Sequence, residues 1–498
     1  MQHKQASIRL DIYHDHGPAT SHNLTSKHKT PIFFSDVLLR NEERVKALHS
    51  RLVNKSSSSS LAASKKAGVP LKLKSISIPL NPALSIGSGN YYVKIGLGTP
   101  TKYYTMILDT GSSFCWLQCR PCISCHTQID PLFDPSKSKT YKTLSCHTSQ
   151  CSSVKDATFN NPSCDAKSSN ACEYTASYSD TSQSQGYLSQ DLLTLTPFQT
   201  LPGFVYGCGK NNLGMFGTSD GIVGLAQHQL SMLSQLSPKY GSVFSYCLPT
   251  VSSGRGGFLS IGNLSLAVPN ISTAYKFTPM LSDSAAPNLY FLRLTAITVA
   301  GRRLEVSPAS YRVPTVMDTG TIITRLPESV YTALREAFVN VMSKRYAQAP
   351  AYSILDACFK GSLHNMPVVP EIQMIFRGAA NLTLKTPNVL IDGVKGITCL
   401  AFASSGSTTN QIAIIGNHQQ QTFSVAYDVS NSRIGFAADG CHWLVFRSDF
   451  VWWLYGHRML LHTYEQRRII CTIKSKLLAN ESLACMYGLY ITFVTCER

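Results

Sequence analysis

The sequence predicts a mainly β protein made of two similar lobes that share one cleft. From Tyr91 onward, short runs rich in Val, Ile, Tyr and Phe are separated by Gly, Pro, Ser and Asn roughly every ten residues, which is typical of sandwiches and barrels. The tripeptide Asp-Thr-Gly occurs twice, 209 residues apart, each time after an apolar run. One copy in each half indicates an internal duplication, and the duplication predicts the two lobes.

The first 80 residues precede this β-rich pattern and do not read as a core. An amphipathic helix is predicted over residues 35–53, and a serine run over 56–60 reads as a flexible linker. One stripe of the helix carries Leu38, Val45, Leu48 and Leu52. We expect residues 1–80 to be a removable pro-segment, with a disordered N-terminal tail as the alternative.

Strands are predicted wherever apolar runs end in turn residues. In chain order these runs are NYYVKIGLGTP, YYTMILDTG, GFVYGCG, DGIVGLA, LYFLRLTAITVAG, TVMDTG, QIAIIGN and FSVAYDV. The clearest helix after the pro-segment begins behind Pro327, a residue suited to a first turn, and ends near Met342. Its apolar face carries Val330, Leu334, Phe338 and Val341.

The texture changes again after Cys441. Residues 442–498 hold three of the four tryptophans and three cysteines, and charged residues interrupt their apolar runs. We therefore expect an atypical tail, either a docking helix or an extension that belongs to the gene model and not to the native protein.

Composition and charge exclude several classes of protein. Only 15% of the residues are charged and 44% are hydrophobic, which argues against a disordered polyelectrolyte. No apolar run reaches the roughly eighteen residues of a membrane-spanning helix. The net charge of +17 is concentrated near the ends, and residues 86–440 carry 25 Lys/Arg against 19 Asp/Glu. Such a modest excess argues against nucleic acid as a partner.

The sixteen cysteines favour disulfides over a metal site. Cys119, Cys122 and Cys125 form a C-x2-C-x2-C run without the paired doublets or spaced histidines of a zinc site, so we expect no metal and no cofactor. N-x-[ST] sequons, among them Asn263, Asn270 and Asn381, are candidate glycosylation sites. Both features favour secretion or a vacuole. The chain opens without an apolar leader, which we interpret as a missing signal peptide, and the chloroplast is the alternative location.

Asp109 and Asp318 are the candidate catalytic residues. Each Asp-Thr-Gly is followed by a hydroxyl side chain, Ser112 in the first copy and Thr321 in the second. Two carboxylates within hydrogen-bond reach share one proton, because both cannot be ionised together. The ionised carboxylate can then take a proton from water while the protonated one donates to a peptide carbonyl oxygen. The chemistry needs neither a metal nor a covalent intermediate.

The other residues of the two tripeptides suit the support of such a pair. Gly111 and Gly320 allow the chain to turn tightly beneath the carboxylates. Thr110 and Thr319 can hydrogen-bond across the junction of the lobes and fix the geometry of the pair. The alternative reading is a pair of Asx turns at two strand ends.

Several segments resemble the pepsin-like aspartic proteases (family A1), and within them the plant nepenthesin-type enzymes. ILDTGSSFCWLQC and VMDTGTIITRLP resemble the two active-site segments, and DGIVGL and AIIGN resemble the apolar segments beneath them. ASYSDTSQSQGYLSQD resembles the flap, which makes Tyr178 the flap tyrosine and Trp116 its tryptophan neighbour, although Ser179 stands where the family usually has Gly. The resemblance implies a pepsin-like acid protease fold with lobes over 81–270 and 271–441.

The resemblance also implies a disulfide framework that spacing alone does not give. The implied bridges are Cys119–Cys122, Cys125–Cys208, Cys146–Cys172, Cys151–Cys164, Cys247–Cys441 and Cys358–Cys399. Cys115 is left as a buried free thiol.

The function implied by these motifs is an acid endopeptidase that is made as a zymogen. We expect polypeptide substrates, inhibition by the chain's own pro-segment, and a monomer. A binding protein of the glycanase-inhibitor type is one alternative on the same fold. A plastid nucleoid DNA-binding protease is another.

Overall fold

The structure, a computed structural model, describes residues 34–53, 75–83, 88–178, 182–214, 216–250, 256–264, 275–378, 380–393, 396–406, 412–438, 441, 471–476 and 491–496. The chain divides into two compact units, Met1–Cys441 and His442–Arg498. In the second unit β29 (Cys471–Lys476) pairs antiparallel with β30 (Ile491–Cys496). The predicted linker, Leu52, Ser179, the Asn270 sequon and the predicted docking helix of the tail lie outside the residues described by side chain.

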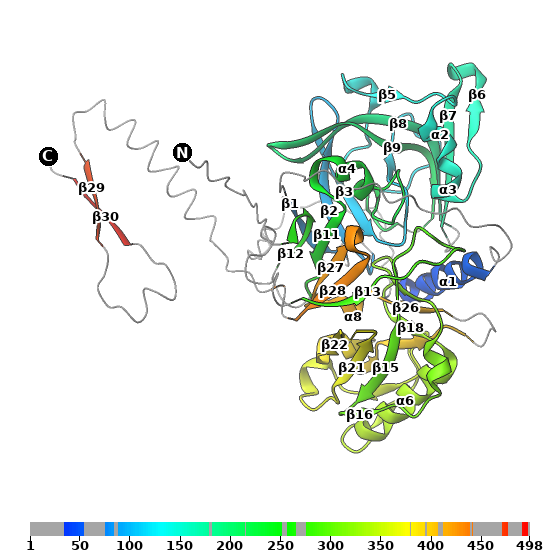
Figure 1. Cartoon of the computed structure of the whole chain (residues 1–498), viewed down its shortest axis with the longest axis vertical. Coiled ribbons are helices and arrows are strands. Elements are labelled where there is room, and N and C mark those ends of the chain that lie inside the picture. Colours follow the sequence, from blue (N-terminus) through cyan, green and yellow to red (C-terminus); the bar gives the residue numbers. More distant parts are fainter. Residues whose placement is uncertain are drawn as a thin grey trace. The chain divides into compact units, whose positions relative to one another are not determined.

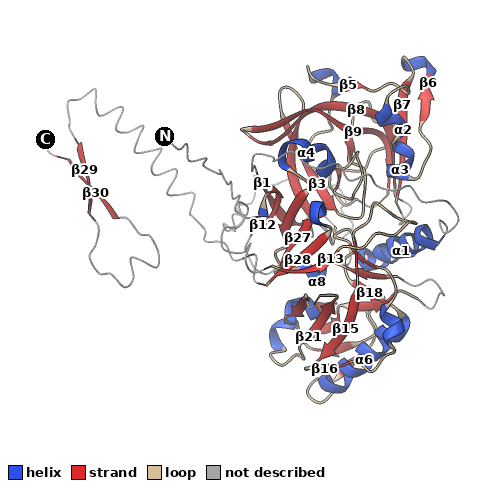
Figure 2. Ribbon diagram, viewed as in Figure 1, coloured by secondary structure: helices blue, strands red, loops and turns tan. Residues whose placement is uncertain are grey.

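The first unit is mainly β, as predicted (Figure 2). Fifteen strands form its largest sheet, in the order β13-β28-β27-β11-β12-β1-β2-β3-β10-β4-β9-β8-β7-β6, with β5 paired to β8. These strands are β1 (Ser75–Pro82), β2 (Tyr91–Leu97), β3 (Lys102–Asp109), β4 (Trp116–Gln118), β5 (Lys142–Thr143), β6 (Ser163–Asp165), β7 (Ala171–Ser177), β8 (Gln183–Thr196), β9 (Gln199–Leu213), β10 (Gly221–Gly224), β11 (Val243–Cys247), β12 (Gly257–Gly262), β13 (Lys276–Pro279), β27 (Ser424–Asp428) and β28 (Arg433–Ala437).

Three smaller sheets complete the C-terminal half, in the orders β14-β17-β26-β18-β25, β16-β15-β21-β22 and β19-β20-β24-β23. Their strands are β14 (Phe291–Leu292), β15 (Leu294–Val299), β16 (Arg302–Arg303), β17 (Thr315–Met317), β18 (Thr324–Leu326), β19 (Gln348–Ala349), β20 (Cys358–Lys360), β21 (Ile372–Phe376), β22 (Asn381–Leu384), β23 (Leu390–Asp392), β24 (Ile397–Leu400), β25 (Phe402–Ser404) and β26 (Ala413–Ile415). The pairing of β11 with β27 joins the two halves within the large sheet (Figure 1).

Helices are few and lie around the sheets. They are α1 (Phe34–Val53), α2 (Ser149–Ser152), α3 (Val154–Thr158), α4 (Met232–Tyr240), α6 (Glu328–Met342), α7 (Thr386–Val389) and α8 (Asn417–Gln420). The stripe predicted for α1 is buried at Leu38, Val45 and Leu48. On α6 the last buried residue is Met342 and not Val341, because Met342 lies one helical turn beyond Phe338.

A duplicated arrangement of four strands carries the two Asp-Thr-Gly copies. β3 runs parallel to β10, β10 antiparallel to β4, and β4 parallel to β9. The second set repeats these directions with β17, β26, β18 and β25. Asp109 ends β3, and Asp318 follows β17 directly. The internal duplication inferred from the sequence is therefore present in the backbone.

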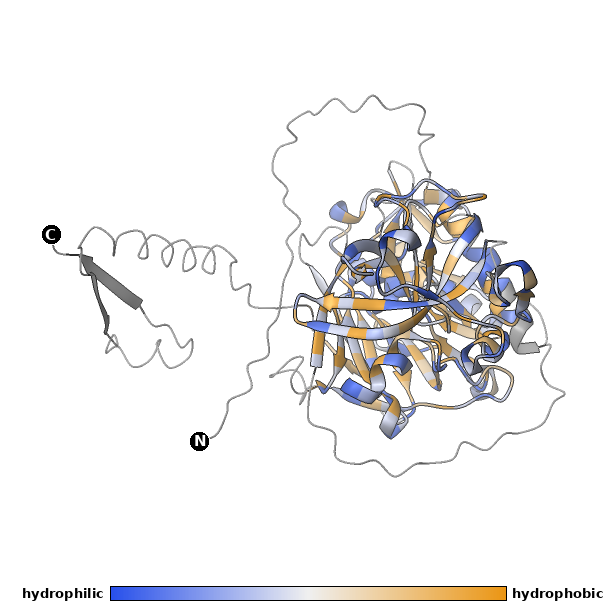
Figure 3. Cartoon of the chain, turned by 90° about the horizontal axis from the view of Figure 1, so that it is seen from above, coloured by the Kyte–Doolittle hydropathy of each residue, from blue (hydrophilic) through white to orange (hydrophobic). Residues whose placement is uncertain are grey.

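Apolar side chains fill the core of the first unit. In Figure 3 the strands of this unit are largely orange, the colour of hydrophobic residues. A group of aromatic rings packs where the two halves join. Tyr427 stacks on Phe244 with ring centroids 4.3 Å apart and meets Tyr290 edge-on at 4.6 Å. These three rings come from β27, β11 and the segment before β14. Their packing therefore holds the two halves, each of which carries one aspartate, against each other.

Six disulfides join the twelve cysteines that the sequence assigned to bridges, and within the described residues Cys115 is a buried free thiol. Two of the predicted pairs are confirmed. Cys358 and Cys399 lie opposite each other on β20 and β24. Cys247, at the end of β11, pairs with Cys441, the last residue of the first unit.

The predicted pairs Cys119–Cys122 and Cys125–Cys208 are wrong. The parallel pairing of β4 with β9 places Cys119 beside Cys208, with their Cα atoms 5.4 Å apart. Cys122 and Cys125 then close a short loop of their own, with Cα atoms 6.1 Å apart. Strand pairing across 89 residues chose these partners, and local spacing carries no trace of it.

The predicted pairs Cys146–Cys172 and Cys151–Cys164 are also wrong. The bridges join Cys151 to Cys172 and Cys146 to Cys164. Cys151 on α2 and Cys172 on β7 are both buried, whereas Cys164 is exposed and Cys146 half-buried. Burial thus sorts the four cysteines into an inner and an outer pair.

Candidate active site

Asp109 and Asp318 meet at the junction of the two halves, where both are almost completely buried. Each carboxylate accepts a hydrogen bond from the backbone of its own tripeptide, from Gly111 N to Asp109 Oδ1 at 2.9 Å and from Gly320 N to Asp318 Oδ1 at 3.0 Å. The two sites therefore repeat each other at the level of single atoms.

A hydroxyl group supports the other oxygen of each carboxylate. Ser112 Oγ donates to Asp109 Oδ2, and Thr321 Oγ1 donates to Asp318 Oδ2 at 2.6 Å. These donors stabilise the ionised form of whichever aspartate carries the charge.

Thr110 and Thr319 hydrogen-bond across the junction, in the way expected from the sequence. Thr110 N donates to Thr319 Oγ1, and Thr319 N donates to Thr110 Oγ1, each at 3.0 Å. Each hydroxyl then donates to a carbonyl of the opposite half, Thr110 to Met317 at 3.2 Å and Thr319 to Leu108 at 3.1 Å. Four reciprocal bonds thus fix the two aspartate loops against each other.

The two glycines are required because the loops approach so closely. A Cβ atom on Gly111 would lie 2.6 Å from Asp318 Oδ1, and one on Gly320 would lie 2.7 Å from Asp109 Oδ1. Any larger residue at either position would push the carboxylates apart.

Arg44 of α1 bridges the two aspartates. Its Nη2 donates to Asp109 Oδ1 at 2.8 Å and to Asp318 Oδ1 at 3.1 Å, and its Nε donates to Asp318 Oδ2 at 3.2 Å. Sequence reasoning found the helix but not this contact. The available signal was the position of Arg44 next to Val45 of the apolar stripe, in a segment already expected to inhibit the enzyme.

The surroundings of the two carboxyl groups shift their pKa values in opposite directions. Burial raises the pKa of Asp109, and the nearby charge of Asp318 adds to this, while Arg44 opposes it. Burial also acts to raise the pKa of Asp318, but Arg44 and the hydrogen bond from Thr321 outweigh it and hold this pKa below its usual range. Although burial disfavours the charge of Arg44, the two carboxylates raise the pKa of its guanidinium. The pair therefore favours one proton on Asp109 beside an ionised Asp318.

The segment predicted to be the flap contributes two antiparallel strands next to the site. β7 and β8 pair antiparallel up to Ser177 and Gln183, and Tyr178 continues beyond the paired end of β7. Trp116 Nε1 donates to the Tyr178 hydroxyl at 2.6 Å, and Phe216 packs edge-on against both rings. The tryptophan and the tyrosine singled out from the sequence therefore touch each other beside the dyad.

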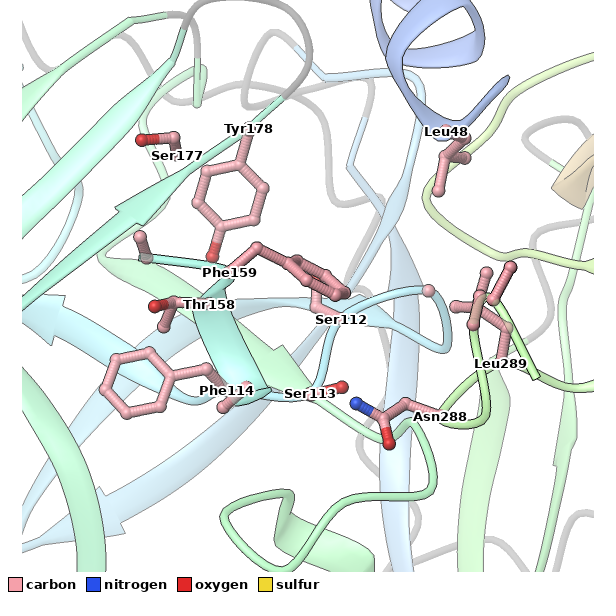
Figure 4. A pocket seen from close by; sticks show the side chains of 15 residues that line it. Leu48, Ser112, Ser113, Phe114, Thr158, Phe159, Ser177, Tyr178, Asn288 and Leu289 are labelled. Atoms are coloured by element: carbon pink, nitrogen blue, oxygen red, sulfur yellow. The ribbon is translucent and has the colours of Figure 1, made fainter. Parts of the chain in front are cut away.

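An apolar pocket opens next to the first aspartate loop (Figure 4). Phe114 and Ser112 lie on its floor, Tyr178 stands at one wall, and Leu289 lines the opposite side. Leu48 of α1 points toward the pocket.

Three further predictions from the sequence concern glycosylation, metal binding and membrane-spanning helices. Asn381 is half-buried at the start of β22, Asn263 follows β12, and Asn270 lies outside the described residues. In the part of the chain that the structure describes, no group of three or more His, Cys, Asp or Glu side chains is arranged to hold a metal ion. None of the described helices is long and apolar enough to cross a membrane.

Both halves of the chain match models of known protein families. Residues 91–263 match the family model "Xylanase inhibitor N-terminal", and residues 289–438 match "Xylanase inhibitor C-terminal". An aspartyl protease family protein of Arabidopsis thaliana is 37% identical and covers 87% of each chain. Aspartic proteinase nepenthesin-2 of Nepenthes gracilis is 33% identical over 71% of this chain and 78% of its own.

Solved structures share the fold at lower identity. Basic 7S globulin from soybean superposes with a TM-score of 0.59 at 21% identity, covering 74% of this chain and 97% of the globulin. Conglutin gamma from lupine seeds gives the same score at 22% identity, covering 74% and 95%.

Proposed function

Because the chain belongs to the plant pepsin-like aspartic proteases, we propose that it is the zymogen of an acid endopeptidase that acts as a monomer. The observation that carries the proposal is the pair of buried carboxylates, each with the same backbone and hydroxyl donors, held together by reciprocal threonine bonds.

The proposed reaction uses the single proton shared by Asp109 and Asp318. The ionised carboxylate takes a proton from a water molecule, whose oxygen forms the new bond to the peptide carbonyl carbon. The protonated carboxylate donates its proton to the carbonyl oxygen, which gives a tetrahedral gem-diol. The carboxyl group that took the proton from water then passes it to the amide nitrogen, and a hydroxyl of the gem-diol returns its proton to the other carboxylate. The C–N bond breaks, the amine and the carboxylic acid leave, and the dyad again holds one proton. Ser112 and Thr321 stabilise the negative charge on each side in turn.

The substrate in this proposal is an extended polypeptide with an apolar side chain near the scissile bond. The pocket lined by Phe114, Tyr178 and Leu289 lies next to Ser112 in the first aspartate loop (Figure 4). An apolar side chain buried there leaves water at a gain of about 25 cal/mol per Å². Main-chain hydrogen bonds would hold the rest of the peptide.

Inhibition by the pro-segment is supported by α1. Arg44 occupies both carboxylates, and Leu48 points toward the apolar pocket. A water molecule and a peptide carbonyl cannot occupy the same positions as the guanidinium. In this proposal the enzyme is therefore inactive until α1 leaves. The six disulfides support secretion or a vacuolar location, because such bridges persist in oxidising compartments.

The test is proteolysis by the full chain after acidification, with denatured globin as substrate at about pH 3–4, where a shared proton is retained. We expect Asp109→Asn to lose essentially all activity and Asp134→Asn, a remote carboxylate that caps a 3-10 turn, to keep it. Wild-type rates in the Asp109→Asn protein would overturn the assignment.

A second candidate is a glycanase-binding protein, favoured by the descriptions of the two matching family models. It predicts that xylanase is retained by the immobilised chain while globin stays intact at every pH, even after α1 has been removed. The intact dyad favours the protease.

A further inference from the structure

Arg325 occupies a position in the second half that corresponds to Trp116 in the first. Trp116 follows Asp109 by the same number of residues as Arg325 follows Asp318. Both stand on the third strand of the duplicated arrangement, and each is the antiparallel partner of the central strand, β10 for Trp116 and β26 for Arg325. The duplication therefore gives the two side chains equivalent places beside the cleft.

Trp116 contacts Tyr178 of the predicted flap, whereas Arg325 contacts Glu42 of α1. Its Nη2 lies 2.8 Å from Glu42 Oε2, while only 1% of the Arg325 side chain is exposed. The contact is an ion pair and does not have the geometry of a hydrogen bond. Accordingly, no hydrogen-bond partner is found for Glu42 Oε2 or for the Nε and Nη2 atoms of Arg325. Among the described residues, this buried guanidinium is thus matched only by a side chain of α1, the helix that leaves on activation in the proposed function.

Asp356 is a second carboxylate that is linked to Arg325 through Tyr331, but other groups already engage it. Tyr331, which interacts electrostatically with Arg325, donates its hydroxyl to Asp356 Oδ1. Arg335 Nε lies 3.0 Å from the other oxygen of Asp356. Among the ion pairs of the described residues, Arg325 is joined to Glu42 alone.

Asn41 shows how a polypeptide can bind beside Arg325. Its Nδ2 donates to Gly320 O at 3.2 Å, and its Oδ1 accepts from Ile322 N at 2.9 Å. This side-chain amide thereby occupies a donor and an acceptor that the main chain of an extended peptide would use. Glu42 is the next residue along the chain, so the segment that saturates the backbone of 320–322 also delivers an acidic group to Arg325.

Apolar surface adjoins this charged position. Val37 and Leu38 of α1 pack in one cluster with Ile322 and Ile323, and Ala403, which pairs with Arg325 across β18 and β25, belongs to the same cluster. Departure of α1 uncovers this surface together with the guanidinium. A side chain with both methylene groups and a carboxylate fits such a position.

We propose that Arg325 is a specificity-determining residue that binds an acidic side chain of the substrate, preferably Glu, in the position that Glu42 holds before activation. The inference rests on the proposed protease function and adds the substrate class of one subsite. A guanidinium that has lost its partner in a poorly hydrated site binds a carboxylate more strongly than a neutral amide.

The experiment compares otherwise identical peptides that carry Glu or Gln at each position around the scissile bond. The enzyme is the acid-activated full chain, assayed at about pH 5, where a Glu side chain is largely ionised. We expect Glu to raise kcat/KM roughly tenfold at one position, the size of one charge-assisted hydrogen bond. Arg325→Met should abolish the preference, and Arg433→Met, which removes an arginine paired with Asp428 far along the chain, should keep it.

Arg325→Lys covers the case in which Arg325→Met fails to fold, and it should reduce the preference without removing it. A second readout is independent of catalysis: binding of non-cleavable Glu and Gln peptides to acid-treated Asp109→Asn chains. Proteolysis without any Glu preference overturns the inference and leaves the protease intact. Arg325-dependent preference in binding without proteolysis overturns the protease and leaves the inference intact. Equal binding of Glu and Gln peptides overturns the inference in either case.

Discussion

At the scale of single residues, the charge contact that matters most is that of Arg44 with Asp109 and Asp318. A charge that bridges two buried carboxylates stabilises their ionised forms, so the binding of α1 is linked to pH. Arg44 lowers the pKa of Asp318 against the effect of burial, so the ionised form of Asp318 is favoured while α1 is bound. Attraction between α1 and the dyad is present above the unperturbed carboxyl pKa and is lost as the pH falls through the lowered one.

Arg44→Met should therefore release α1 at a higher pH than the wild type. We expect the midpoint of release to rise by about one pH unit, because a charge-assisted contact of roughly 1–3 kcal/mol is removed. Hydrogen exchange of the α1 amides, measured from neutral to acid pH, reports the midpoint. Lys46→Met removes an exposed cation of the same helix that pairs with Glu43, and it should leave the midpoint in place. Equal midpoints for wild type and Arg44→Met would contradict the linkage.

Single residues also show where sequence reasoning ends. Asp109, Asp318 and the two threonines could be predicted, because a rare tripeptide occurs twice after similar strands. Arg44 and Arg325 could not, since each depends on which surface α1 covers. A tertiary contact of this kind has no local periodicity or spacing.

At the scale of elements, α1 is held by its apolar stripe as well as by charge. Leu38 is fully buried against the second half, whereas the neighbouring Leu39 is 52% exposed. The two residues have the same side chain and the same helix propensity. They therefore separate docking from helix formation.

Leu38→Ala should loosen α1 from the body by about 2–5 kcal/mol, the usual cost of truncating a buried leucine. Leu39→Ala should change its docking by less than about 0.5 kcal/mol. Hydrogen exchange at neutral pH distinguishes the two, with protection lost in α1 and retained in the central strands β3 and β17. If both variants lost protection equally, helix propensity and not packing would hold α1 in place.

Elements differ in how far the sequence determines them. The strands beneath the dyad and α6 were predictable, because their apolar residues follow the period of the structure they form. The disulfide partners within the Cys-rich segment were not. Cys119 meets Cys208 only because β4 runs beside β9, and that pairing is a property of the sheet.

At the scale of the whole molecule, one bridge closes about two fifths of the chain. Cys247 and Cys441 are 194 residues apart, and the second half of the protein lies between them. Cys122 and Cys125 are 3 residues apart. The two bridges therefore constrain the unfolded chain to very different extents.

Replacing Cys247 and Cys441 by Ala should lower the free energy of unfolding by about 5 kcal/mol, against about 2 kcal/mol for Cys122 and Cys125, from the entropy of loop closure. Urea unfolding of the two double variants, with the other bridges oxidised, gives the comparison. Equal losses would show that the long bridge acts through native contacts and not through the unfolded chain.

The attachment of α1 to the body has a kinetic consequence. While residues 54–74 are intact, the helix is tethered, and its effective concentration at the dyad is of millimolar order whatever the dilution of the protein. One cut in that connection converts the same contact into an encounter between two molecules, which dilution weakens. A single hydrolytic event would thus make an otherwise reversible opening permanent once the released fragment is diluted.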